Sequence, residues 1–207
     1  VLEPLPSQAQ VARDVTQSLE TGIDGKAERE VAIEAIRSDL MADAGMAATG
    51  MLVDETFLSG FDLQAEARWE DMVFDHHVLA LEERIQAQEE VVTWLGFFSP
   101  FLAMRALSSG LCGTDYAHHR HFTTYAETWR KALVLQLNQT FAEKAGAEGW
   151  DYRAGPELWK NAPPFDYRAP SPSDALGLHM LSVLSLLMWL SLALWLARRS
   201  ALRVKVV

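Results

Sequence analysis

Histidines supply the most suggestive chemistry in this sequence. His118, His119 and His121 lie within one short stretch, and His118 and His121 stand three positions apart, so on a helix they share one face. A second pair, His76 and His77, lies earlier in the chain. Neutral imidazoles are good ligands for copper and zinc, and two of them at this spacing can share one ion. We therefore take His118, His121, His76 and His77 as candidate ligands of a copper or zinc site.

A second interpretation of these histidines needs no metal. Two of them can serve as hydrogen-bond donors in the core while the others face solvent. The one cysteine, Cys112, lies six residues before His118, and a single cysteine excludes both an intrachain disulfide and a multi-cysteine zinc or iron–sulfur site. Both interpretations stay open, and nothing else in the sequence calls for a cofactor.

Motifs for the common catalytic chemistries are missing from the sequence. It contains no phosphate-binding G-x-x-x-x-G-K-[ST] loop, no G-x-S-x-G elbow and no H-E-x-x-H pair. We expect Arg130 with Glu127 or Glu70, and Arg105 with Asp115, to form structural ion pairs. The chain is therefore not expected to be an enzyme, although an enzyme with an unrecognised site remains an alternative.

The charge of the chain is distributed unevenly. Of 207 residues 28 are acidic and 18 basic, and every acidic residue precedes position 175. An acidic protein lacks the basic face that binding to phosphate backbones requires, so nucleic acid is excluded as the main partner. The chain begins with Val1 and shows no signal-peptide pattern near that end, which indicates a fragment or a processed product.

The segment from Ala175 to Ala197 decides the broad class of protein. It holds 23 residues without a formal charge, and at about 1.5 Å per residue it spans the roughly 30 Å hydrocarbon core of a bilayer. Basic residues follow at once, and cytoplasmic flanks of membrane helices are enriched in them. We expect residues 175–197 to cross the membrane, 198–207 to be a cytoplasmic tail and 1–174 to be extracytoplasmic. His179 falls near the outer boundary.

The remaining patterns predict an all-α domain. Segments 7–20 and 26–44 are rich in helix formers, and 62–92 and 116–145 each carry apolar residues at helical spacing, so we expect two long antiparallel helices. Segment 45–60 mixes glycine with short apolar runs and is expected to be irregular, and the proline-rich segment 146–174 to be extended. The expected apolar rows are Phe74, Val78, Leu81, Ile85 and Val92 on the first helix, and Phe122, Tyr125, Trp129, Leu133, Leu137 and Phe141 on the second.

The apolar stretch 91–113 allows two interpretations. It is too short, and too interrupted by Gly96, Pro100 and Arg105, to cross a membrane. It is either a buried core element or a membrane-interface segment, with its aromatic residues in the lipid and Arg105 at the headgroups.

Three stretches form a pattern similar to that of a known family: GFDLQAEARWEDMVFDHH (60–77), FFSPFLAMRALSSGLCGTDYAHHRHF (97–122) and AETWRKALVLQLNQTFAE (126–143). Together they resemble ABC-2 type transporter permeases, often described as involved in multi-copper enzyme maturation, in the branch with a large extracytoplasmic domain before the last membrane helix. The resemblance implies a multi-pass protein of the bacterial inner membrane. It also implies a separate cytoplasmic ATPase subunit, a second permease copy or homologue, and the lipid bilayer as partners.

Two functions from different classes follow. The first is a permease fragment whose outer domain contacts substrate or an extracytoplasmic partner. The second is a membrane-tethered metal-binding or sensor domain that uses the histidines.

Overall fold

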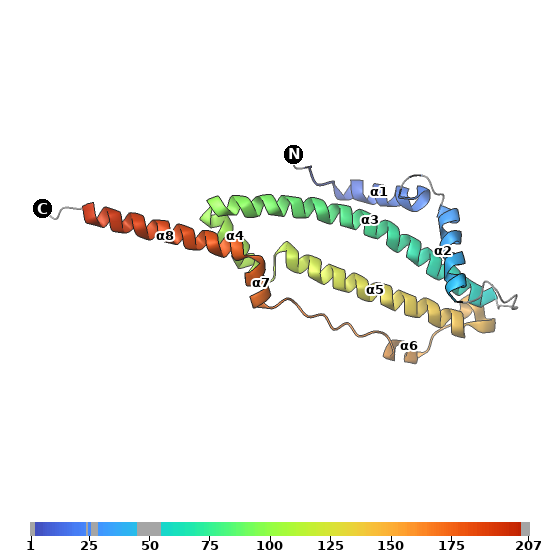
Figure 1. The fold of residues 1–207 in the computed structure, drawn as a ribbon. Helices are drawn as coiled ribbons and strands as arrows, with labels where there is room; N and C mark the ends of the chain where they lie inside the picture. The colour runs from blue at the N-terminus through green and yellow to red at the C-terminus, as the bar shows by residue number, and fades with distance from the viewer. Residues whose placement is uncertain (1–2, 24, 26–28, 45–54, 204–207) are drawn as a thin grey trace. The chain divides into compact units, whose positions relative to one another are not determined.

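A computed structural model describes residues 3–23, 25, 29–44 and 55–203. This described part of the chain is helical and contains no strand, so the predicted all-α class is confirmed (Figure 1). The elements are α1 (Gln8–Thr21), α2 (Arg29–Asp43), α3 (Glu55–Phe98), α4 (Pro100–Leu111), α5 (Tyr116–Lys144), the 3-10 helix η2 (Gly146–Asp151), α6 (Pro156–Lys160), α7 (Pro172–Leu178) and α8 (Met180–Arg203).

The chain divides into two compact units. Unit 1 comprises Glu3–Arg84 with Glu127–Phe165, and unit 2 comprises Ile85–Ala126 with Asp166–Val207. The long helices α3 and α5 each contribute to both units.

Unit 1 has its core where α1 and α2 cover the first half of α3. Helix α1 begins at Ser7, which forms a capping box with Gln10 that satisfies backbone N–H groups at the helix start. Two connected clusters make up the core: Val15, Trp69 and Val73, and Leu40, Phe61 and Ala65.

The expected apolar row on α3 is wrong. Phe74, Val78 and Val92 are about half exposed, whereas the buried residues Phe61, Ala65, Trp69 and Val73 recur every four positions on a neighbouring face. Residues four apart lie above one another on a helix. Apolar residues occur on more than one face of α3, and contact with α1 and α2 determines which of them are buried.

Helices α3 and α5 run antiparallel, as predicted. Gly60 lies so close to Ala142 that a Cβ at Gly60 would overlap the Ala142 side chain. In unit 1, Gly60 near the start of α3 lies against Ala142 near the end of α5, whereas Asp71 and Asp75, later in α3, pair with Arg130 and Lys131, earlier in α5. In unit 2, Gln86 pairs with Arg120.

Several predicted boundaries shift. Helix α3 begins at Glu55, so the expected irregular segment 45–60 is helical from that residue, and 45–54 lies outside the described residues. At its other end α3 continues to Phe98, where Ser99 caps α4 and Pro100 takes the first helical position. The segment 146–174, expected to be extended, contains η2, α6 and the start of α7.

The apolar segment at the C-terminus is two helices rather than one. Ala175 to Leu178 belong to α7, His179 breaks the helix, and α8 begins at Met180. Helix α8 continues through Arg198 and Arg199 to Arg203, so residues 198–203 of the expected tail are helical, and 204–207 lie outside the described residues.

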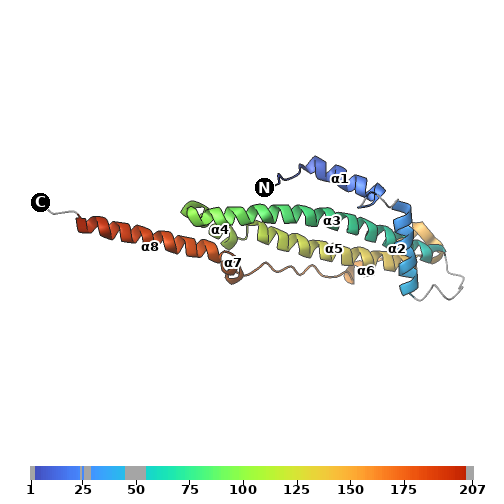
Figure 2. The ribbon, with the colours of Figure 1, turned by 45° about the horizontal axis from the view of Figure 1, so that its top comes forward.

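Helix α8 is long and apolar enough to span a membrane by its length and composition. A core helix of a soluble protein would be mostly buried, yet every residue of α8 from Leu190 to Arg203 is exposed. Helix α4 packs beside the first half of α8 (Figures 1 and 2).

Candidate functional site

The turn between α4 and α5 builds the candidate site in unit 2. Gly113 adopts a positive φ of 67°, and its N–H donates to the Gly110 carbonyl at 3.1 Å. The Thr114 N–H donates to the Ser109 carbonyl at 2.9 Å. This is the hydrogen-bond pattern of a Schellman motif, which ends a helix and turns the chain sharply. It delivers Asp115 to the first position before α5.

Asp115 caps α5. Its Oδ1 accepts the backbone N–H of His118 at 3.0 Å and lies 2.5 Å from the Nδ1 of the same residue. The Asp115 side chain is 10% exposed and that of His118 is 8% exposed. A helix cap on the surface needs only the hydrogen bond to the backbone. The second bond, to the His118 ring, and the burial of both side chains give Asp115 a further role.

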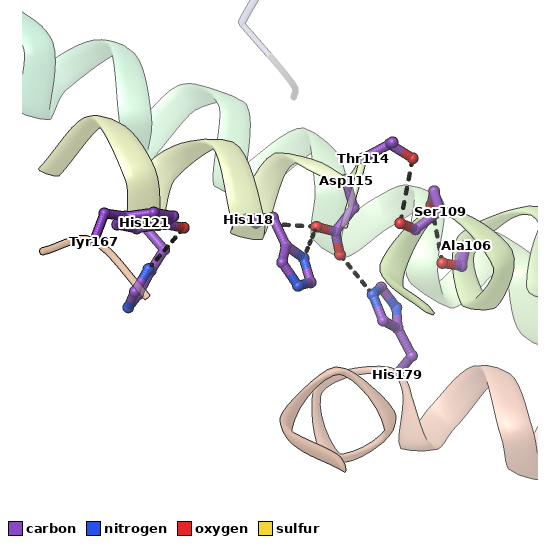
Figure 3. Close-up of polar contacts among 8 residues, drawn as sticks. All are labelled: Ala106, Ser109, Thr114, Asp115, His118, His121, Tyr167 and His179. Atoms are coloured by element: carbon purple, nitrogen blue, oxygen red, sulfur yellow. Dashed lines mark hydrogen bonds and ion pairs between the residues drawn. The ribbon is translucent and has the colours of Figure 1, made fainter. Parts of the chain in front are cut away.

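The other carboxylate oxygen reaches the start of α8. Asp115 Oδ2 lies 2.7 Å from Nε2 of His179, the residue between α7 and α8 (Figure 3). Gly110 makes room for this contact, because a Cβ on Gly110 would overlap the His179 ring. We call Asp115 with His118 and His179 the Asp115 bridge.

The Asp115 bridge is held by an ionised carboxylate. Burial by itself would raise the pKa of Asp115, but the hydrogen bonds from the His118 backbone and from the His179 and His118 rings outweigh burial and hold the pKa below its usual value. An ionised carboxylate only accepts hydrogen bonds, so the ring nitrogens facing it must carry hydrogen. This requirement fixes a hydrogen on His118 Nδ1 and on His179 Nε2.

The nearby hydroxyl groups donate hydrogen bonds to backbone carbonyls. Thr114 Oγ1 donates to the Ser109 carbonyl at 3.3 Å, and Ser109 Oγ donates to the Ala106 carbonyl at 2.9 Å (Figure 3). A catalytic nucleophile would need its hydroxyl within hydrogen-bonding reach of a histidine base, whereas these two hydroxyls bond backbone carbonyls. The geometry is that of a hydrogen-bonded joint between the start of α5 and the start of α8.

A second joint in unit 2 involves Tyr167. His121 Nδ1 lies 3.2 Å from the Tyr167 hydroxyl, and the Tyr167 ring packs against those of Phe122 and Tyr125. These contacts fix the extended residues that precede α7 along the first turns of α5.

A third joint ties α8 to the end of α3. The Ser185 hydroxyl lies 3.1 Å from the carbonyl oxygens of both Gly96 and Phe97, and the Trp189 indole N–H donates to the Phe97 carbonyl at 3.3 Å. These carbonyls belong to the last turn of α3, whose oxygens lack partners within the helix.

The four histidines predicted as metal ligands are divided between the units, with His76 and His77 in unit 1 and His118 and His121 in unit 2. His118 bonds Asp115 and His121 bonds Tyr167, and the two rings face different partners (Figure 3). His77 Nε2 contacts the Ser18 hydroxyl at 2.9 Å, and His76 packs edge-to-face against His77 in unit 1. Within the described ranges, no group of three or more His, Cys, Asp or Glu side chains is arranged to hold a metal ion. Copper or zinc binding stays a prediction.

One of the two predicted ion pairs is confirmed. Arg130 binds Glu127, one of its two expected partners, and also pairs with Asp71. The hydrogen bond from Arg130 lowers the pKa of Glu127. Asp115, expected to pair with Arg105, bonds the two histidines instead.

Sequence reasoning missed the partners of α8. His179 drew attention as an ionisable group in an apolar segment, but Asp115 lies 64 positions away and nothing local connects them. Ser182, Ser185 and Trp189 follow at spacings of three and four, which places polar groups on one face of an apolar helix. That pattern could have identified the face of α8 that packs on protein.

A sequence profile described as "Domain of unknown function (DUF3526)" matches residues 27–168. The range includes Asp115 and His118 and ends before His179, so the Asp115 bridge connects the matched domain to the segment that follows it. No curated protein and no solved structure gives a significant match to the chain. Because the profile covers more than half of its residues, the chain belongs to the DUF3526 family.

Proposed function

We propose that this chain is the outer domain and last membrane helix of an ABC-2 type permease. In this role the helical domain lies outside the cytoplasm, and α8 carries movements of the membrane part to it. A separate cytoplasmic ATPase supplies the energy, a second permease copy or homologue completes the membrane part, and the domain contacts the transported substrate or an extracytoplasmic partner.

The observation that carries the proposal is the way α8 is attached. Helix α8 is apolar and exposed, while its first residues are bonded to the rest of unit 2 through buried polar groups at Asp115 and Ser185. A helix that served only as an anchor could follow a flexible linker. An attachment at several points suits a helix whose displacement must move the domain.

The direction of α8 follows from its charges. Arg198, Arg199 and Arg203 lie at its C-terminal end, and basic residues favour the cytoplasmic side. This orientation places residues 1–174 outside the cytoplasm, where a long acidic domain is tolerated.

The permease assignment also has support from the sequence pattern that resembles this family. The GTD motif of that pattern forms the turn that positions Asp115, and the first histidine after it completes the buried cap. The resembling residues thus build the attachment of α8.

Isolation of the intact protein tests the proposal. The protein, with an affinity tag, is purified from its native membranes in mild detergent, and the copurified proteins are identified by mass spectrometry. We expect a P-loop ATPase in stoichiometric amount, lost when the tag is carried by an unrelated membrane protein. Repeated absence of an ATPase under conditions that keep the membrane complex intact would overturn the proposal.

A further inference from the structure

The end of α3 and all of α4 form an apolar hairpin, comprising residues 91–111, most of whose large apolar side chains are exposed. Phe98 is 75% exposed and Phe101 is 66% exposed. Trp94, Leu95 and Met104 are also exposed. The interpretation of this stretch as a buried core element is therefore wrong. So many neighbouring large apolar side chains on one element indicate a surface that meets something other than water.

The acidic residues of α3 end just before the hairpin begins. Glu89 and Glu90 lie just before it, and Arg105 is the one formal charge from Val91 to Leu111. An arginine can extend its apolar stem through lipid and place its guanidinium at the headgroups. This composition is that of a lipid-facing segment.

Contacts with α8 indicate the depth of the hairpin tip in a bilayer that α8 crosses. Ser185 and Trp189 bond the last turn of α3, and they lie five and nine residues into α8. At about 1.5 Å per residue these positions are roughly 8 and 14 Å from the start of α8. One leaflet of a bilayer has a hydrocarbon thickness of about 15 Å. The tip of the hairpin therefore lies beside α8 at the level of one leaflet.

Several backbone groups at the tip are satisfied by protein. The Gly96 and Phe97 carbonyls receive hydrogen bonds from α8, the Ser99 side chain accepts the Leu102 N–H, and Pro100 has no N–H. In water the helix end could bond solvent. In hydrocarbon an unpaired carbonyl costs several kcal/mol, and irregular backbone is tolerated only where protein groups satisfy it.

We propose that the apolar hairpin is a re-entrant element that inserts into the outer leaflet beside α8, with lipid acyl chains covering Phe98, Phe101 and Met104. The inference rests on the membrane anchor of the proposed function. It adds a second element of the domain that enters the bilayer from the same side as α8, so the domain is held to the membrane surface at two places.

Site-directed spin labelling of the full chain tests the insertion. Single cysteines are introduced in a Cys112→Ser background at Phe98 and Phe101 in the hairpin, at Met188 in α8, and at Trp159 in α6 as an exposed control. Each labelled protein is reconstituted into vesicles of phosphatidylethanolamine and phosphatidylglycerol. The accessibility of the label to oxygen, which concentrates in lipid, is compared with its accessibility to a water-soluble nickel chelate.

We expect labels at 98, 101 and 188 to favour oxygen and the label at 159 to favour nickel. Nickel-accessible labels at both 98 and 101, with an oxygen-accessible label at 188, would overturn the hairpin insertion and leave the anchor intact. Labels at 98 and 101 shielded from both reagents would show that protein covers the hairpin, which also overturns the insertion. A nickel-accessible label at 188 would overturn the anchor and the insertion together.

Discussion

Substitution of Asp115 by asparagine removes the charge of the bridge and keeps its shape. Asparagine caps helices about as well as aspartate, so the start of α5 is retained. One carboxylate oxygen becomes an NH2 group, which cannot accept the hydrogen of His179 Nε2. A hydrogen bond to a charged group contributes about 1.5–3 kcal/mol, so we expect the Asp115→Asn variant to lose about 2 kcal/mol of stability.

A double-mutant cycle isolates the bond between the two residues. His179→Phe keeps a ring beside Gly110 and removes the donor, and the cycle combines it with Asp115→Asn. Contacting residues in one network couple by about 0.5–3 kcal/mol, and we expect about 1–2 kcal/mol here. The measurement is urea-induced unfolding of the full chain in mild detergent, followed by far-ultraviolet circular dichroism.

A control pair and a refuting result complete this prediction. Lys160 forms only an exposed ion pair with Glu157 in α6, so Lys160→Ala combined with Asp115→Asn is expected to be additive. Additivity within about 0.5 kcal/mol for Asp115 with His179 would refute the claim that their bond holds the start of α8.

The same carboxylate predicts a dependence on pH. The folded-state pKa of Asp115 lies below its ordinary value of 3.8, so folding favours its charged form. This contribution to stability is present above about pH 3.8 and is lost as the pH falls through the lower folded-state pKa. Below pH 4 the wild-type protein should therefore lose more stability than the Asp115→Asn variant. An identical slope in both proteins would contradict this assignment.

Three further substitutions and one control test the joints of α8 and the surface. Gly110→Ala should cost about 1–3 kcal/mol, because its Cβ displaces the His179 ring, and it should abolish the coupling described above. Ser185→Ala should cost about 1–2 kcal/mol in the same unfolding assay, whereas Ser191→Ala, whose hydroxyl bonds only the Leu187 carbonyl of its own helix, should cost almost nothing. Arg130→Ala should change stability by less than about 1 kcal/mol, because its ion pairs are partly exposed; a larger loss would assign it a role beyond these pairs.

Local patterns predicted the helices well, because capping and breaking signals act over a few residues. Asp115 stands directly before the predicted helix 116–145, where aspartate is a favoured cap, and it accepts the His118 backbone N–H there. The core face of α3 was predicted wrongly. Phe74 and Val78 repeat at helical spacing as well as Trp69 and Val73 do, and only the packing of α1 and α2 separates the two sets.

The candidate site depended on contacts that sequence does not reveal. Asp115 has two oxygens, and sequence accounts for one of them through the cap. The second oxygen bonds His179, 64 positions later. This contact forms because α4 packs on α7 and α8, and because Gly110 leaves room for the His179 ring. The break at His179 was missed for a similar reason, since the residues on both sides of it are equally apolar.

The side of the membrane on which the domain lies is the most direct test of the proposed arrangement. Cys112 is exposed in the turn before Asp115 and is the one cysteine of this sequence, so it reports on the domain without substitution. Intact cells expressing the intact protein are treated with a membrane-impermeant maleimide, and its Cys112→Ser variant serves as the control. The arrangement predicts labelling of the wild-type protein in intact cells. Labelling that appears only after the cells are broken would contradict it.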